Sequence, residues 1–197
     1  MKYLIICLYL YLPTVCLSQK LWTEEDRKYL LDNLDRTTAE LEKEVEGLTE
    51  EQWHFKEGTD KWSIAQVIEH LGIYERKYYD QRYQTSLLPP EPELDKNTPS
   101  DDFYSEWMGE DQPHEAPLSA IPLELMVGNK NWTFFKVGRD RNVDKIKSAD
   151  IDFRAYYSYR SRNRRWNIHQ LYIILYAHCD RHLKQIKRIK THSDFPK

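Results

Sequence analysis

The sequence predicts an all-α fold, a bundle of long amphipathic helices with one long irregular connection. Helix-capping patterns precede stretches in which apolar residues recur every three or four positions, and most prolines gather in a single segment between two such stretches. The chain has 197 residues, enough for one core that buries most of its apolar surface without disulfides. We therefore expect a single folded domain, residues 19–197, after a short N-terminal targeting segment.

The first helix begins after Thr23, whose side chain can cap it. Asp26 stands three residues later and completes an approximate capping box. Gly47 occupies a position where a helix typically ends. Between these residues an apolar stripe is formed by Leu30, Leu34, Leu41, Val45 and Leu48.

The second helix begins after Ser63, where Gln66 completes another capping box. Its pattern continues to about Gln84. The apolar side of this helix is formed by Ile64, Val67, Ile68, Leu71, Tyr74 and Tyr78.

Residues 87–122 differ in character from the rest of the chain. They hold seven of the nine prolines and an excess of Asp and Glu over Lys. A tight helical hairpin needs fewer residues, so we expect this segment to be a crossover along the bundle between the second and third helices. The third helix is expected over residues 132–149, although Gly138 interrupts its pattern.

The last helix has the clearest pattern in the chain. Its apolar stripe, with steps of three or four residues and one expected face, comprises Ile168, Leu171, Leu175, His178, His182, Ile186 and Ile189.

The N-terminus has the pattern of a secretory signal peptide. Lys2 precedes an apolar run, residues 3–12, that is too short for a transmembrane helix, and cleavage after Ser18 would follow the preference for small residues. The residues before Cys16 are poor predecessors for a lipid-modified cysteine, so lipoprotein processing is disfavoured. We expect an exported protein, periplasmic or extracellular, without a membrane span after cleavage of residues 1–18.

The charge of the chain argues against a nucleic-acid ligand. Its formal net charge of −3 becomes −4 when Lys2 leaves with the signal peptide. A short basic run has one aromatic neighbour and is expected to be a solvated turn before the last helix; it consists of Arg160, Arg162, Arg164 and Arg165. The Asn-Trp-Thr triplet at residues 131–133 is interpreted as a chance glycosylation pattern.

Three histidines lie on the predicted apolar faces. His178 and His182 are four residues apart, so their Cβ atoms should lie about 5–6 Å apart on one face. His70 takes an equivalent place on the second helix. Three neutral imidazoles facing a bundle interior can bind a divalent metal ion and leave a fourth position open. Hydrogen-bonded core histidines are the alternative, and periodicity alone leaves both interpretations open.

The other candidate residues lack such a pattern. The metalloprotease motif His-Glu-x-x-His is not met, because Cys179 and not a glutamate follows His178. Cys179, the one cysteine expected in the mature chain, is interpreted as a small buried apolar residue that cannot form an internal disulfide. Four histidines without a partner at ligand spacing are expected at the surface: His54, His114, His169 and His192.

Two segments resemble the DinB-like superfamily. These are Trp-Ser-Ile-Ala-Gln-Val-Ile-Glu-His-Leu at residues 62–71 and Ala-His-Cys-Asp-Arg-His-Leu-Lys-Gln-Ile at residues 177–186, supported by residues 48–53 and 194–196. The resemblance implies a four-helix bundle with a crossover between the second and third helices. It also implies a metal triad of His70, His178 and His182. Nickel and zinc occur in this family, and zinc, nickel, iron and manganese are not distinguished here.

The resemblance further implies thiol-dependent transferase or isomerase chemistry, although low-molecular-weight thiols are scarce outside the cytoplasm. The leading hypothesis is a metal-dependent transferase or hydrolase acting on a small-molecule substrate or a thiol, with Tyr74 and Glu75 supporting the ligands. A metal- or ligand-binding bundle without turnover is the second hypothesis, and a bundle with structural histidines is the third. A homodimer is left open.

Overall fold

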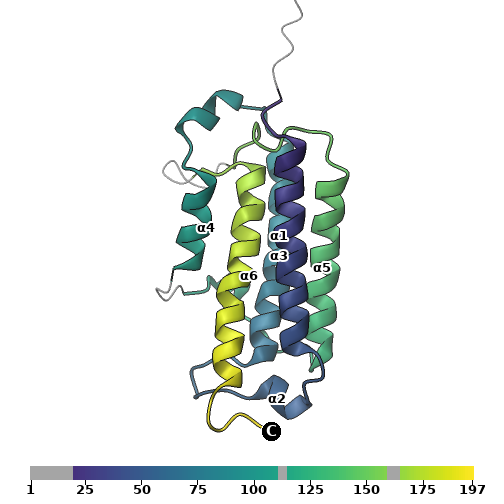
Figure 1. Ribbon diagram of the computed structural model, residues 1–197, viewed down its shortest axis with the longest axis vertical. Coiled ribbons are helices and arrows are strands. Elements are labelled where there is room, and N and C mark those ends of the chain that lie inside the picture. The colour runs from purple at the N-terminus through teal and green to yellow at the C-terminus, as the bar shows by residue number, and fades with distance from the viewer. Residues whose placement is uncertain (1–19, 111–114, 159–164) are drawn as a thin grey trace, which may run out of the picture.

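The protein is a four-helix bundle with additional short helices along one side (Figure 1). The structure is a computed structural model that describes residues 20–110, 115–158 and 165–197. The bundle helices are α1 (Glu24–Val45), α3 (Ile64–Ser86), α5 (Asn129–Lys147) and α6 (Ile168–Lys190). The described residues contain no β-strand, only an isolated bridge between Tyr157 and Asn167. The all-α four-helix prediction is confirmed.

Each bundle helix contacts two others. Helix α1 packs against α5 and α6, and α3 packs against the same two helices, which places α1 and α3 on opposite sides of the core. Helices α3 and α5 run in the same direction in Figure 1, and α1 and α6 run in the opposite one. A parallel α3–α5 pair requires a connection that returns along the whole bundle, so the expected crossover is present.

The helix starts agree with the capping residues. Thr23 and Ser63 each close a capping box with the residue three positions later, and Asn167 does the same for α6. A short helix, α2 (Glu50–His54), begins after Thr49 with its own capping box. Gly47 ends α1 with φ +72°, a left-handed conformation that favours glycine.

The long connection is more regular than predicted. Its described residues contain two 3₁₀ helices and one α-helix: η1 (Pro92–Asn97), α4 (Asp101–Gly109) and η2 (Leu118–Ala120). Helix α4 packs alongside α6 (Figure 1). Because α4 has only nine residues and proline-containing segments flank it, it lacks the long periodic pattern from which the other helices were predicted.

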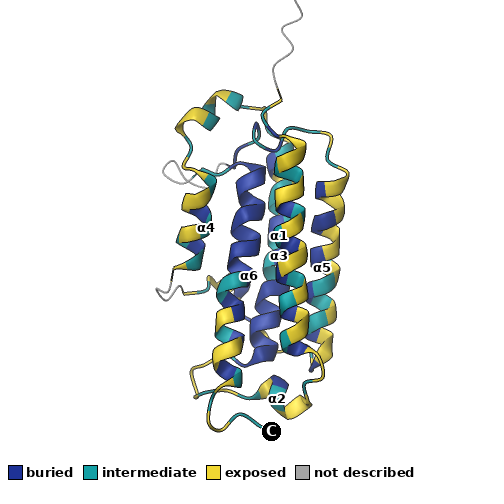
Figure 2. Ribbon diagram, viewed as in Figure 1, coloured by how far each residue is buried: buried dark blue, intermediate teal, exposed yellow. Residues whose placement is uncertain are grey.

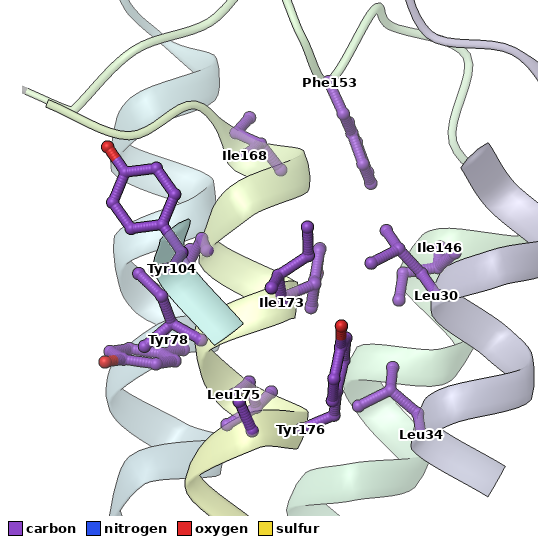
Figure 3. Close-up of a cluster of buried hydrophobic side chains, with 14 of the residues drawn as sticks. Leu30, Leu34, Tyr78, Tyr104, Ile146, Phe153, Ile168, Ile173, Leu175 and Tyr176 are labelled. Atoms are coloured by element: carbon purple, nitrogen blue, oxygen red, sulfur yellow. The ribbon is translucent and has the colours of Figure 1, made fainter. Parts of the chain in front are cut away.

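Helix α6 is buried on more than one face. Tyr172, Ile173 and Ile174 are buried together with the predicted stripe, and Figure 2 shows the first half of α6 buried around its circumference. Figure 3 shows Tyr104 of α4 on one side of α6 and Leu34 of α1 on the other. The single-face prediction was therefore incomplete, because α4 covers a face of α6 that a four-helix bundle would leave in solvent.

The start of α5, the Asn-Trp-Thr triplet and the N-terminus were also the subject of predictions. Helix α5 begins at Asn129 rather than at residue 132. Asn131 is fully buried, so the Asn-Trp-Thr triplet is unsuited to glycosylation in the folded protein. The predicted signal peptide, residues 1–18, lies outside the described residues. Within the described part of the chain, no helix has the length and apolar character needed to cross a membrane.

Candidate metal centre

The three predicted histidines meet in the interior between α3 and α6. Nε2 of His178 lies 3.3 Å from Nε2 of His70 and 3.0 Å from Nε2 of His182. One ligand atom from each ring can be chosen so that all three atoms lie within 4.8 Å of one another. All three side chains are buried. The four-residue spacing on α6 and the inward position of His70 on α3 produce this convergence.

The rings of His70 and His182 are oriented by hydrogen bonds from Nδ1, the nitrogen that faces away from the cluster. Nδ1 of His70 lies 2.7 Å from the carbonyl oxygen of Ala120, and Nδ1 of His182 lies 2.8 Å from Oε1 of Gln185. Since both oxygens accept, the proton of each ring is on Nδ1. The Nε2 lone pairs of His70 and His182 are therefore available toward the shared space.

Burial keeps these imidazoles neutral. Desolvation is the largest influence on both rings, and it lowers the pKa of His70 to about 4 and that of His182 to about 3. The hydrogen bonds to Ala120 and Gln185 oppose this effect only in part. Neutral imidazole is the form that binds a metal ion.

A strap formed by residues 118–124 covers the His70 side of the cluster. The carboxylate of Glu69 accepts backbone N–H groups of Leu123 (3.1 Å) and Glu124 (2.9 Å). The side-chain amide of Gln66 donates to Glu124 at 2.7 Å. These contacts tie the strap to the same helix that carries His70, and they hold the Ala120 carbonyl in place. The sequence reasoning missed the strap, because no local pattern marks a largely irregular segment that contacts a distant helix.

Tyr74 and Glu75, which were predicted to support the metal ligands, lie in different surroundings. The Tyr74 ring lies beside the cluster, with centroid distances of 4.9 Å to His70 and 4.4 Å to His178. The Trp62 ring lies 4.8 Å from His70 on another side. Glu75 was predicted wrongly, because its carboxylate accepts from Arg139 at 2.7 Å and from Asn142 at 2.8 Å. It belongs to a buried polar network between α3 and α5.

The remaining candidates are placed as follows. Cys179 is buried as expected, its Sγ lies 2.9 Å from a guanidinium nitrogen of Arg139, and burial raises the pKa of its thiol to about 12. His54 is exposed and His192 is partly buried. His114 lies outside the described residues, as do three arginines of the basic run: Arg160, Arg162 and Arg164.

His169 is a correction to the surface prediction. It is fully buried, accepts a hydrogen bond from the indole N–H of Trp22 at 3.1 Å, and lies 3.2 Å from the carboxylate of Asp101. The segment before α1 and the start of α4 cover it, and neither packing could be foreseen from its position off the α6 stripe.

The histidine cluster fits a divalent metal ion. Two imidazole ligands about 2.0–2.1 Å from a tetrahedral ion would lie about 3.3 Å apart, close to the two Nε2 separations given above. All three rings are buried, and His70 and His182 are neutral and oriented from behind by hydrogen-bond acceptors, as is usual for metal-binding histidines. Three ligands leave a fourth position, which is the arrangement of catalytic rather than purely structural zinc sites.

Comparison with known proteins agrees with this fold. Residues 33–186 match the profile of the DinB superfamily. YfiT from Bacillus subtilis, described as "a probable metal-dependent hydrolase with an unusual four-helix bundle topology", superposes with a TM-score of 0.52 at 12% sequence identity. That match covers 85% of this chain and 87% of YfiT, and at this identity it establishes the fold alone. A search of curated protein sequences gives no significant match. Since the family profile spans most of the chain, this protein belongs to the DinB superfamily.

Proposed function

We propose that this protein binds one divalent metal ion through His70, His178 and His182 and is a metal-dependent hydrolase or transferase. The convergence of three buried Nε2 atoms on one space is the observation that carries the proposal. The description of YfiT as a probable metal-dependent hydrolase supports the hydrolase reading by analogy of fold. A divalent ion bound here would act as a Lewis acid toward a water or thiol at its open position.

The surrounding residues have separate tasks in this proposal. The Ala120 carbonyl and Gln185 hold two imidazoles in the binding tautomer. The rings of Trp62 and Tyr74 limit access of bulk water to the ligands.

Metal content tests the first part of the proposal. We expect about one ion per chain by elemental analysis of protein purified without a His tag, and little in the His178→Ala/His182→Ala variant. His54→Ala, which removes an exposed histidine, should retain the ion. An unmodified protein that contains no ion, even after incubation with zinc or nickel salts, would rule out the site.

Turnover assays distinguish a metal-dependent enzyme from a bundle that binds the metal without catalysis. The metal-loaded protein is tested on activated esters, and on thiol-reactive electrophiles with a low-molecular-weight thiol present. The enzyme reading predicts that His182→Ala abolishes turnover while its circular dichroism spectrum is unchanged. Stoichiometric metal without turnover on either panel would favour the non-catalytic metal-binding bundle.

Export is a separate part of the proposal, supported by the apolar run of residues 3–12 after Lys2. We expect the mature chain to begin at Gln19, outside the cytoplasm. N-terminal mass spectrometry of the protein from a fractionated native host measures this, and an intact N-terminus in the cytoplasmic fraction would contradict it.

A further inference from the structure

A hollow of about 590 Å³ lies next to the histidine cluster. It is bounded by α3, α4 and Trp166, which stands two residues before the start of α6. Of the described residues that line it, four are aromatic: Tyr74 and Tyr78 from α3, Trp107 from α4, and Trp166. Met108 adds an apolar surface, and charged side chains such as Lys77 and Glu110 lie among the lining residues. The volume is within the range of small-molecule sites in proteins.

Tyr74 connects this hollow to the histidines. Its ring lines the hollow and lies 4.4 Å from the His178 ring, measured between centroids. A group bound in the hollow would therefore be separated from the cluster by the thickness of one aromatic ring.

The α4 wall of the hollow is held firmly. The hydroxyl of Tyr104 donates to the carbonyl of Arg165 at 2.6 Å, and Asp101 at the start of α4 forms an ion pair with Arg154 at 2.7 Å. Tyr104 and Met108 are buried against α6. Trp107 is therefore positioned by a packed helix and not by a loop, which favours a preformed binding wall.

We infer that this hollow binds the organic part of the substrate, and that the preferred group is flat and aromatic. Tyr78, Trp107 and Trp166 bring aromatic surface to the hollow from three segments, which suits contact with a planar ligand, while the Tyr74 ring already has the Lys77 ammonium 5.1 Å from its centroid. The assignment to substrate rests on the proposed function, since it supposes a reaction at the adjacent histidines. The binding of an aromatic molecule does not depend on that reaction and can be measured separately.

The probe is N-phenyl-1-naphthylamine, a neutral aromatic molecule whose fluorescence rises in an apolar site. We expect saturable binding to the full chain and at least about a tenfold higher Kd for Trp107→Ala, because that change removes one stacking wall. Trp107→Phe keeps a ring and should retain most of the affinity.

Two controls locate the site. Trp132→Ala makes the same substitution in a second hollow, of about 390 Å³, beside Trp53. Phe103→Ala removes an exposed ring from α4 that does not line the first hollow. Both variants should bind within about twofold of the parent. No saturable binding, or an equal loss in Trp132→Ala and Trp107→Ala, would overturn the inference.

The metal centre is tested independently with the His178→Ala/His182→Ala variant. Probe binding by this variant supports the hollow even if elemental analysis finds no ion in the parent, in which case only the proposed function fails. An ion in the parent together with no effect of Trp107→Ala on probe binding would reject the hollow and leave the metal centre standing.

Discussion

The Nδ1 atom of His70 lies 2.7 Å from the carbonyl oxygen of Ala120, a residue 50 positions further along the chain. This contact joins a helix of the bundle to the strap that covers the histidine cluster. Because a backbone carbonyl can only accept, it sets the tautomer of His70 and directs Nε2 toward the other two rings. Metal affinity at the proposed site should therefore depend on how the strap is anchored.

Removing the strap anchor should weaken metal binding. Glu69→Ala removes the carboxylate that accepts from Leu123 and Glu124, so the Ala120 carbonyl loses its fixed position. We expect the metal Kd to rise about tenfold, measured by competition with a chromogenic chelator. Leu123→Ala truncates an exposed side chain of the strap, keeps both backbone N–H groups and the contact between Gln66 and Glu124, and serves as the control with little expected change. Equal affinities in the parent and Glu69→Ala would show that the strap does not orient His70.

The hydrogen bond between His182 and Gln185 on α6 should also support metal binding. Gln185→Ala removes the acceptor of the His182 Nδ1 proton and should lower metal affinity about tenfold or more. Gln185→Glu keeps an acceptor at the same place and should restore the affinity. The chelator competition measures both variants, and failure of the glutamate variant to rescue binding would contradict a hydrogen-bonding role.

Glu75 should contribute to stability and not to metal binding. It forms a fully buried ion pair with Arg139 at 2.7 Å, and Glu75→Ala would leave the guanidinium without its charge partner. We expect a loss of about 3–5 kcal/mol in the free energy of unfolding by urea. The double variant Glu75→Leu/Arg139→Met should lose less, because no charge is left unpaired. A strong loss of metal affinity in a folded Glu75→Gln variant would instead support the earlier prediction that Glu75 assists the ligands.

Gly138 allows α5 to approach α3 closely. A Cβ atom at this position would lie 2.7 Å from Cβ of Glu75, which is too close for an ordinary contact and cannot be relieved by a flexible side-chain end. Gly138→Ala should therefore destabilise the protein by about 1–3 kcal/mol, measured by urea unfolding. Gly109→Ala meets no atom within 4 Å and should leave stability nearly unchanged. Similar stabilities for the two variants would contradict the close approach.

The ion pairs at the start of α4 should make stability sensitive to acid. Burial raises the pKa of Asp101, but hydrogen bonds and charges of His169 and Arg154 outweigh it, so the pKa falls well below the usual 3.8. Arg154 also holds the pKa of Asp26 below its usual value, although burial opposes this shift. With folded-state values below the unfolded ones, this stabilisation is present above about pH 4 and is lost as the pH falls further.

The Asp101→Asn variant tests this directly. It should lower the free energy of unfolding by about 1–2 kcal/mol at pH 7 and show a shallower decline between pH 4 and pH 2 than the parent. Urea unfolding across this pH range gives both quantities. Parallel stability curves for the parent and the variant would show that Asp101 does not supply the acid sensitivity.

The sequence alone was sufficient for features that depend on nearby residues. A helix start such as Ser63 with Gln66 is encoded within four residues, and the inward pair His178 and His182 follows from the geometry of one helix. The crossover followed from the length and proline content of residues 87–122. His70 was included in the predicted metal triad because it lies on the apolar face of the second helix and because the family resemblance implied it.

Only the tertiary structure decided features that depend on distant contacts. Helix α4 makes α6 buried on several faces, and the Ala120 carbonyl reaches His70 across 50 residues of sequence. His169 is buried because Trp22 and Asp101 cover it, and Glu75 pairs with Arg139 instead of supporting a ligand. In each case the partner comes from another element, and periodicity within one helix carries no information about which element packs against it.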